Sequence, residues 1–425
     1  MLCQMCRKDF WIRGRPPIQV TELLLTGCDM ERIAIRGHLA ELDGLRAIAV
    51  LLVFFYHTPF SSGAGVQKYL ASFFHSGYTG VDLFFVLSGF LITGILVEAK
   101  GTANYFKTFY MRRTLRIFPL YYFVLAILLV ALLAAKYGFA HHVSAYTMSF
   151  INAGLDSQKW LWPYLANAEF AIFGPGAMQP CFVHFWSLSV EEQFYLMWPL
   201  LVWRFGTRSL ARIAFGMIAG AIVIRTIFWH FGAIDAAFSV TFSRMDALAI
   251  GALIALWMRT NPLQKTARYA GMALIIPAVI FLGYVFAAYG QLDFRIPSLT
   301  VPMLSAPALF YAGLLLMILG SPTKAWVGFF RLRPLRFLGT ISYGFYVYHG
   351  IIRRIIEKPT KALMEHHQAM RLPLGMAILI GSFAGTTLIA WLSWTLFEKR
   401  VLRFKSRFEY AEKGPKQVAT AAATA

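Results

Sequence analysis

Charged residues are scarce in this sequence. Of its 425 residues, 14% are Asp, Glu, Lys or Arg, whereas about a quarter are charged in a soluble globular domain. In contrast, 58% are hydrophobic, the mean hydropathy is +0.59, and apolar runs of about 20 residues, long enough to cross a bilayer as a helix, recur along the chain. The composition excludes a soluble globular protein and predicts an all-α, polytopic integral membrane protein.

Acidic residues and cysteines are also few. The 20 Asp and Glu face 40 Lys and Arg, which leaves a formal net charge of +20. The basic residues cluster at the ends of apolar runs, so their expected partner is the lipid bilayer and not nucleic acid. The four cysteines form no disulfide framework. Cys3 and Cys6 make a single CxxC without a second pair, so we expect no metal site.

The apolar runs predict about ten transmembrane helices. The predicted spans are 42–60, 79–98, 117–135, 184–204, 210–231, 240–258, 269–287, 299–319, 337–356 and 372–397. The segment 136–183 is the long connection, because it holds Gly174, Pro175, Gly176 and Pro180 and its apolar pieces are too short to span.

The distribution of Lys and Arg predicts the orientation. The connections on one side carry 28 of them and those on the other side 9, five of these in 353–371. By the positive-inside rule both termini are cytoplasmic, which requires an even number of spans. We expect residues 1–40 to form a disordered cytoplasmic extension, 41–403 the membrane domain, and 404–425 a disordered cytoplasmic tail.

Several polar residues lie inside predicted spans, where an ionised group costs about 2.5–3.5 kcal/mol at mid-bilayer. In "LDGLRAIAVLLVFFYH", Arg46 lies near the cytoplasmic side and His57 roughly 16 Å further out. Arg46 is interpretable as a snorkelling anchor. In "HFWSLSVEEQFYLMWP", which begins at His184, Glu191 and Glu192 point about 100° apart and so are not expected to face one cavity wall. This glutamate pair in the outer half of the span indicates function.

Further polar residues leave alternatives open. Thr79 and Asp82 in "GYTGVDLFFVLSGFLITG" fit a capping box, so Asp82 is structural or functional. Arg113 and Arg116 share a helical face at the cytoplasmic mouth, where arginine forks suit phosphate or lipid headgroups. The remaining candidates are Arg244 with Asp246, which can neutralise each other or neighbours, and His349; we assign them and His184 to a cavity or the acceptor site.

These stretches resemble the acyltransferase family 3 membrane proteins, which include O-antigen and exopolysaccharide acetylases. The resemblance runs from about Glu41 to Arg403 and rests on motifs in the family's order. They are Arg46-x10-His57, "GVDLFFVLSGFLI", "RRTLRIFP", "WSLSVEEQFYLMWP", "SRMDALAIG", "GTISYGFYVYH" and "WTLFEKR". The N-terminal extension departs from the family pattern.

The resemblance implies an enzyme of the bacterial inner membrane that moves an acyl group, usually acetyl, from cytoplasmic acetyl-CoA to a hydroxyl of an envelope carbohydrate. Acetyl-CoA is then a co-substrate, and no cofactor is bound permanently. His57 matches the family's essential histidine, Arg46 its companion, Glu191 the motif glutamate, and Arg113 with Arg116 the Arg-x-x-R associated with acyl-CoA. We expect His57 to act as general base or acyl carrier, oriented by Glu191 or Asp82.

A transporter or flippase is the competing interpretation, because buried carboxylates and histidines also form proton relays. The sequence shows no inverted repeat and no matching pair of broken helices, which favours the enzyme. The acceptor, the acyl length, the reaction route and the oligomeric state stay open at this stage.

Overall fold

The structure is a computed structural model that describes residues 39–57, 66–138, 144–260, 264–366 and 371–411. Across these residues it is helical and contains no strand, which confirms the all-α prediction. The extension predicted over 1–40 lies outside the described residues except for its last two, and so does the tail beyond residue 411.

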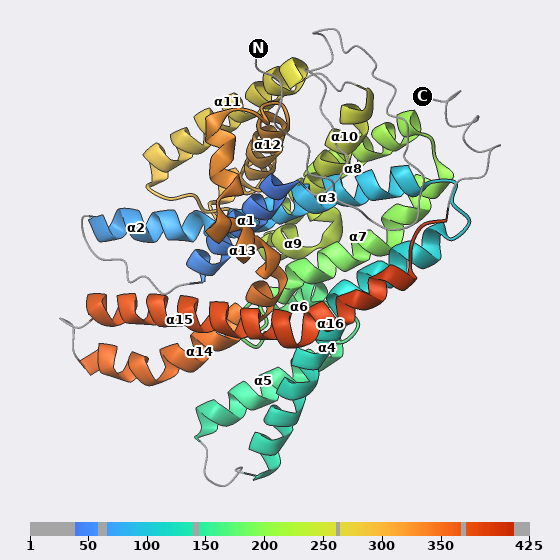
Figure 1. The fold of residues 1–425 in the computed structure, drawn as a ribbon. Helices are drawn as coiled ribbons and strands as arrows, with labels where there is room; N and C mark the ends of the chain where they lie inside the picture. Colours follow the sequence, from blue (N-terminus) through green and yellow to red (C-terminus); the bar gives the residue numbers. More distant parts are fainter. Residues whose placement is uncertain (1–38, 58–65, 139–143, 261–263, 367–370, 412–425) are drawn as a thin grey trace, which may run out of the picture.

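The helices follow one another with short connections (Figure 1). The α-helices are α1 (Ala40–Tyr56), α2 (Val66–His75), α3 (Gly80–Ala99), α4 (Tyr105–Gly138), α5 (Ala145–Leu161), α6 (Ala166–Phe173), α7 (Phe185–Arg204), α8 (Thr207–His230), α9 (Ile234–Ser239), α10 (Thr241–Thr260), α11 (Gln264–Tyr289), α12 (Thr300–Leu319), α13 (Arg333–Thr340), α14 (Ser342–His366), α15 (Arg371–Ser393) and α16 (Lys399–Leu402). Short 3-10 turns are η2 (Ser76–Thr79), η3 (Pro297–Leu299), η4 (Ala325–Arg331) and η7 (Arg403–Arg407), and η6 (Trp394–Glu398) is a π-helical turn.

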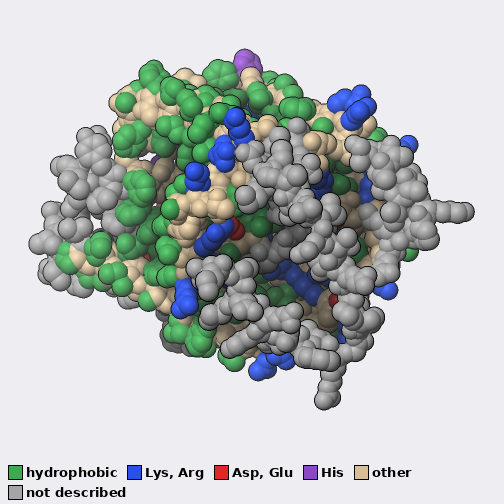
Figure 2. All heavy atoms as spheres, turned by 45° about the horizontal axis from the view of Figure 1, so that its top comes forward, with side chains coloured by type: hydrophobic (Ala, Val, Ile, Leu, Met, Phe, Trp, Pro, Cys, Tyr) green, Lys and Arg blue, Asp and Glu red, His purple; other side chains and the backbone are tan. Residues whose placement is uncertain are grey.

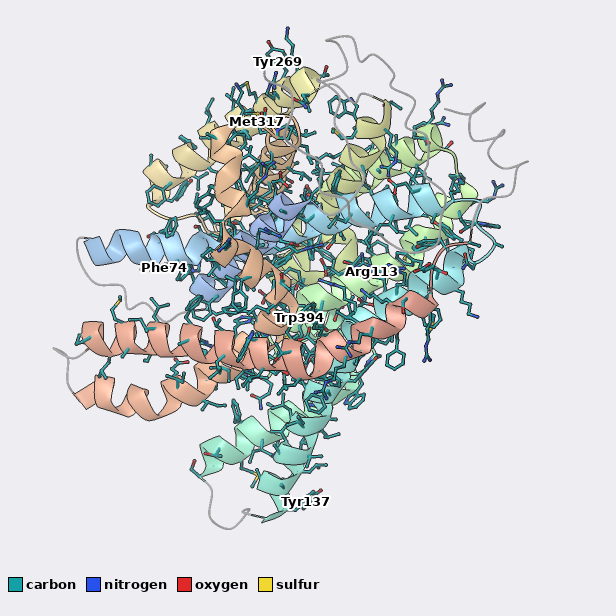
Figure 3. All side chains as sticks on the ribbon, viewed as in Figure 1. Phe74, Arg113, Tyr137, Tyr269, Met317 and Trp394 are labelled. Carbon is teal, nitrogen blue, oxygen red and sulfur yellow. The ribbon has the colours of Figure 1, made fainter. Side chains whose placement is uncertain are left out.

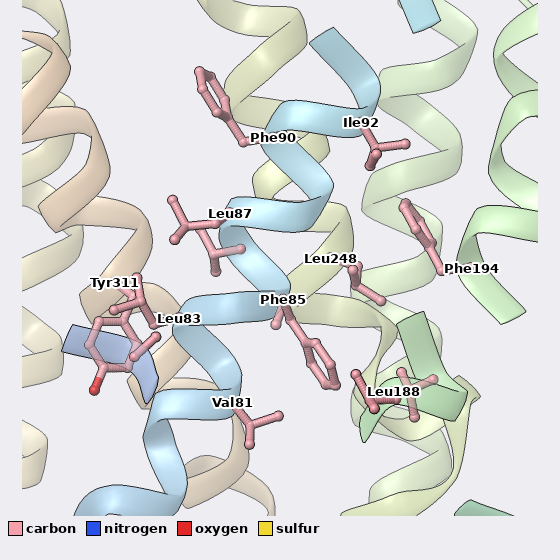
Figure 4. Packing of buried hydrophobic residues seen from close by; sticks show 14 of the residues in the cluster. Val81, Leu83, Phe85, Leu87, Phe90, Ile92, Leu188, Phe194, Leu248 and Tyr311 are labelled. Carbon is pink, nitrogen blue, oxygen red and sulfur yellow. The ribbon is translucent and has the colours of Figure 1, made fainter. Parts of the chain in front are cut away.

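Helix α3 lies at the centre of the molecule. It is predominantly apolar, and most of its residues are buried, which is typical of a helix that is surrounded by protein. Its side chains pack against α7, α10 and α12 (Figure 4). The crossing with α10 is a backbone contact, because a Cβ on Gly89 would lie 1.9 Å from the carbonyl oxygen of Leu248 and one on Gly251 2.1 Å from that of Val86. Small residues at such crossings are typical of helix packing in membranes.

Seven helices in the described part of the chain are long and apolar enough to cross a membrane. These candidate spans are Ala71–Ala99, Tyr105–Gly138, Thr207–His230, Ile234–Thr260, Gln264–Tyr289, Thr300–Leu319 and Pro373–Arg407. The other three predicted spans exist as helices α1, α7 and α13–α14. These helices are too short or too polar to be identified as membrane spans by length and composition. They carry Arg46, the Glu191–Glu192 pair and His349; α1 has only 17 residues, and α14 also contains charged residues such as Arg353 and Arg354.

Contacts between connections divide the helix ends into two groups. At one end, Lys100 Nζ donates to the carbonyl of Phe205 (2.6 Å), Arg268 donates to that of Gly320 (3.0 Å), and Arg331 bonds to Glu41. At the other end, His75 and Asp293 lie 3.3 Å apart. Each group joins segments that the charge count assigned to one side. Lys and Arg side chains gather on one face, some within a hollow (Figure 2).

The segment 404–411 is packed, whereas we expected it to belong to a disordered tail. Arg112 donates to the carbonyl of Phe408 (2.9 Å), and Asn104 bonds to the backbone of Glu409 and Ala411 (2.7 and 2.9 Å). The polar start of α4 therefore binds this segment through its backbone, an interaction that the composition of the tail does not reveal.

Candidate active site

Two neighbouring cavities contain most of the candidate residues. The first, which we call the arginine chamber, has a volume of about 100 Å³ and lies between α1, α3, α4, α7 and α14. Its polar lining consists of Arg46, Arg113, Arg116, Ser88, Ser187, Glu191, Glu192, Tyr195, Ser342, Tyr343 and Tyr346. The second, which we call the histidine pocket, has a volume of about 60 Å³ and contains His57 and His184.

The three arginines of the chamber come from two helices. Arg113 and Arg116 lie three residues apart on α4, so that both point to one side, and Arg113 points toward α7 (Figure 3), with its guanidinium 5.0 Å from the ring centre of Tyr195. Arg46, in the second turn of α1, bonds to Asp43 one turn earlier (3.0 Å). The shared face predicted for Arg113 and Arg116 is confirmed. Three guanidinium groups in one cavity form a site suited to phosphate or carboxylate groups.

The two glutamates belong to the arginine chamber. Glu191 accepts a hydrogen bond from Ser88 Oγ (2.6 Å), and Ser88 accepts one from the Tyr195 hydroxyl (3.0 Å). Glu192 lines the chamber as well as a second opening of about 210 Å³ between α4 and α7. Both glutamates therefore line one cavity, and the expectation that they would not face one cavity wall was wrong.

Three histidines meet at the histidine pocket: His57 and His184 line it, and His349 of α14 lies beside them. The ring centres of His57 and His349 are 5.1 Å apart, those of His57 and His184 5.9 Å, and those of His184 and His349 4.3 Å. His57 Nδ1 lies 2.8 Å from the carbonyl oxygen of Val53. Because a carbonyl only accepts, Nδ1 carries the proton and Nε2 is left with a free lone pair. Such a nitrogen can take a proton from a hydroxyl group.

Two imidazole nitrogens beside His57 have no hydrogen-bond partner. His349 Nδ1 donates to the carbonyl of Tyr346 (2.6 Å), but the Nε2 atoms of His184 and His349 are buried without a partner. Orphaned buried polar atoms are rare in folded proteins and mark sites of function or of bound solvent. Among the described residues, no group of His, Cys, Asp and Glu could hold a metal ion.

Aromatic residues form much of the rest of the histidine pocket. Tyr56, Tyr78, Phe170, Trp186 and Phe238 line it, and Arg295 stands at its edge. The Tyr78 hydroxyl is buried without a partner. Arg295 is 42% exposed at its side chain, and its nearest carboxylate, Asp235, is 3.8 Å away. Aromatic rings with a few polar atoms are typical of pockets that bind small polar ligands.

The expected orientation of His57 by Glu191 or Asp82 is not supported. The hydrogen bond to Val53 occupies His57 Nδ1, Glu191 bonds to Ser88, and Asp82 Oδ1 lies 2.6 Å from Arg244 Nη2. The capping-box alternative for Asp82 was also wrong, since Thr79 makes no side-chain cap and Asp82 is fully buried.

The charges of α10 are neutralised by neighbouring helices and not by each other. Arg244 pairs with Asp82 of α3, and Asp246 Oδ2 pairs with Arg225 Nη2 of α8 at 2.7 Å. Residues two apart on a helix point in different directions. The guanidinium of Arg244 also lies 5.5–5.9 Å from the ring centres of Phe85, Trp186 and Phe238. Trp186 and Phe238 line the histidine pocket, so this ion pair supports its wall.

Sequence reasoning missed several residues of the two cavities. Ser88 is one of them, and its hydroxyl bonds to Glu191. Tyr346 and Ser187 had drawn no attention, although Tyr346 lies three residues before His349 in "GFYVYHG" and therefore shares its face. That spacing was the available signal. Arg295 and Tyr78 had none, because only the fold brings them to His57.

A family model described as an acyltransferase domain matches residues 39–394 of the chain. The chain is 28% identical over 334 residues to the peptidoglycan O-acetyltransferase OatA of Listeria monocytogenes and 27% over 337 residues to the O-acetyltransferase OatA of Staphylococcus aureus. It is 29% identical over 328 residues to YrhL of Bacillus subtilis, provisionally named a peptidoglycan O-acetyltransferase.

These alignments cover 73–75% of this chain and 48–51% of the relatives, so the chain spans about half of their length. No solved structure matches it. The match to the family model includes every residue that lines the two cavities. The chain is a multi-pass membrane protein that belongs to acyltransferase family 3.

Proposed function

We propose that this protein is a membrane O-acyltransferase that moves an acetyl group from acetyl-CoA to a hydroxyl of a cell-envelope carbohydrate. The observation that carries the proposal is the adjacency of two chemically different cavities: one rich in guanidinium groups, the other built around His57 with a free ring nitrogen. The names of the relatives favour peptidoglycan as the first acceptor to test.

In this proposal the arginine chamber receives the donor. Arg113 and Arg116 bind phosphates of the CoA moiety at the mouth, because planar guanidinium forks match phosphate oxygens. Arg46 lines the same chamber and attracts the donor electrostatically. The acyl-pantetheine arm then extends toward His57, which is roughly 16 Å of helix beyond Arg46.

His57 acts as the general base. Its Nε2 takes the proton of the acceptor hydroxyl while the hydroxyl oxygen attacks the thioester carbonyl, so that a C–O bond forms and the C–S bond breaks. The proton ends on the CoA thiol. An imidazole suits this step, because its ordinary pKa lies close to neutral pH. A direct transfer needs no covalent intermediate on the protein.

The proposed topology has ten membrane crossings, in which α1, α7 and α14 cross in addition to the seven more apolar candidate spans. Both termini and the mouth of the arginine chamber face the cytoplasm, where CoA is available, and the histidine pocket faces the other side of a bacterial cytoplasmic membrane. The excess of Lys and Arg on one side supports this orientation.

Sealed right-side-out vesicles test the proposal. Soluble peptidoglycan fragments are added outside, and labelled acetyl-CoA is either enclosed or supplied outside. We expect labelled fragments only with enclosed acetyl-CoA, and roughly 10²–10⁴-fold less label from the His57→Ala variant. Equal labelling by external acetyl-CoA would contradict the topology.

The competing transporter is tested with the same vesicles. Uptake or release of labelled fragments without acetyl-CoA would favour transport, whereas a transferase moves label only when acetyl-CoA is consumed. Purified protein that neither consumes acetyl-CoA nor acetylates a panel of envelope glycans would refute the proposed function.

A further inference from the structure

Tyr346 of α14 lines both the arginine chamber and the histidine pocket. No other described residue belongs to the lining of both. The side chain is buried, with 4% exposed. Its ring centre lies 5.9 Å from that of Phe84, which lines the chamber, and 5.1 Å from that of His184, which lines the pocket. The Tyr346 ring is therefore part of the wall between the two cavities.

Two hydrogen bonds hold the Tyr346 hydroxyl in this position. The hydroxyl donates to the backbone carbonyl of His184 (2.8 Å), and Ser187 Oγ lies 2.6 Å from the same hydroxyl. Ser187 Oγ also lies 3.2 Å from the His184 carbonyl, so the two hydroxyl groups and this carbonyl form one hydrogen-bonded cluster. Both partners lie at the start of α7. We call these hydrogen bonds the latch; they join α14 to the helix that also carries Glu191.

The inference about this wall rests on the proposed function, in which the two reacting groups start on opposite sides of it. The thioester arrives from the arginine chamber, and the base and the acceptor hydroxyl lie in the histidine pocket. For the C–O bond to form as the C–S bond breaks, the two reacting groups must meet. The ring of Tyr346 stands between them in the closed arrangement described here.

We propose that Tyr346 is a positioning residue that separates the two cavities and opens when the acyl-pantetheine arm enters. The latch to Ser187 and to the His184 carbonyl keeps the wall closed in the absence of donor. With the wall closed, water from the histidine pocket does not reach the thioester in the chamber. The acyl group therefore passes to an acceptor hydroxyl in preference to water.

The latch is weak enough to open. Losing the Tyr346 hydroxyl removes about one net hydrogen bond and should raise the open fraction roughly two- to twelvefold. Removing the ring as well, as in Tyr346→Ala, should leave the wall open. The conservative and the drastic variant thus predict effects of graded size, which a purely structural role for the tyrosine would not produce.

The first experiment measures release of CoA thiol from acetyl-CoA in the absence of acceptor. Release leaves acetate when water attacks the thioester. We expect roughly two- to twelvefold faster release for Tyr346→Phe and a larger increase for Tyr346→Ala. Tyr348→Ala is the matched control, since Tyr348 lies on the same helix, lines neither cavity and bonds to Ser393 (3.3 Å). Equal or lower release by both Tyr346 variants would overturn the inference.

The second experiment does not depend on acetyl transfer. The four native cysteines are replaced by serine, and a single cysteine is introduced by His57→Cys in the pocket or Ser88→Cys in the chamber. Pantethine, the disulfide of pantetheine, is supplied on one side of sealed vesicles and exchanges with the cysteine, releasing one pantetheine thiol. The side that labels the Ser88→Cys protein defines the donor side.

From the donor side, we expect slow labelling at position 57 when Tyr346 is present and faster labelling with Tyr346→Phe or Tyr346→Ala. Labelling at position 88 should stay constant, which also shows that the variants keep the chamber folded. Equal labelling at position 57 with and without Tyr346 would overturn the wall. A failure of the enzyme to use acetyl-CoA would refute the proposed function but would leave this measurement decisive for Tyr346.

Discussion

The buried pair of Asp82 and Arg244 allows a quantitative prediction about stability. Both side chains are buried, with at most 1% of each exposed, and Asp82 Oδ1 lies 2.6 Å from Arg244 Nη2. The second carboxylate oxygen of Asp82 and the Nε and Nη1 atoms of Arg244 have no other partner. Each charge therefore depends on the other for its compensation, and removal of either one should be costly.

The two single substitutions should differ in cost. Asp82→Asn leaves a guanidinium that cannot lose its proton. The free energy of unfolding should therefore fall by roughly 3–5 kcal/mol, the cost of breaking a buried ion pair. Arg244→Met leaves a carboxyl group that can take up a proton, and we expect about 1–3 kcal/mol, the cost of an unsatisfied polar group. The double variant buries no uncompensated charge, so it should be more stable than Asp82→Asn alone.

The assay is unfolding of the purified protein from lipid bicelles by increasing amounts of SDS, with the wild type and the three variants measured side by side. Arg225→Met serves as a comparison, because it breaks the neighbouring pair with Asp246 (2.7 Å). The reasoning fails if Asp82→Asn and Arg244→Met cost the same and their costs add in the double variant, since that would mean that the two charges do not compensate each other.

Three further predictions concern the cavities. His57→Ala should reduce acetyl transfer by roughly 10²–10⁴-fold, the contribution of a general base, while membrane insertion is retained; near-normal product from inserted protein would exclude this role. Arg113→Lys should raise the apparent KM for acetyl-CoA although the charge is kept, because lysine lacks the planar fork; an unchanged KM in Arg113→Ala as well would favour lipid anchoring. Gly350→Ala should reduce transfer, because its Cβ would lie 2.8 Å from His184 Cε1, whereas Gly375→Ala, with open space around its Cβ, should have little effect.

Much of the architecture follows from the sequence alone. Apolar runs of sufficient length make helices in a bilayer, because only a helix satisfies every backbone group within one segment. The common orientation of Arg113 and Arg116 toward one cavity was equally predictable, since residues three apart share a helical face. The motifs around His57 also indicated the family, which the match over residues 39–394 confirms.

The partners of the polar side chains depended on the tertiary structure. Helical periodicity determines which residues of one helix share a face, but not which helix that face meets. Asp82 meets Arg244, 162 residues away, and Ser88 meets Glu191, 103 residues away. The backbone contact at Gly89 and Gly251 sets α3 against α10 and so brings the first of these pairs together. For the same reason the convergence of His57, His184 and His349, and the place of Tyr346 between the two cavities, could be decided only by how three distant helices pack.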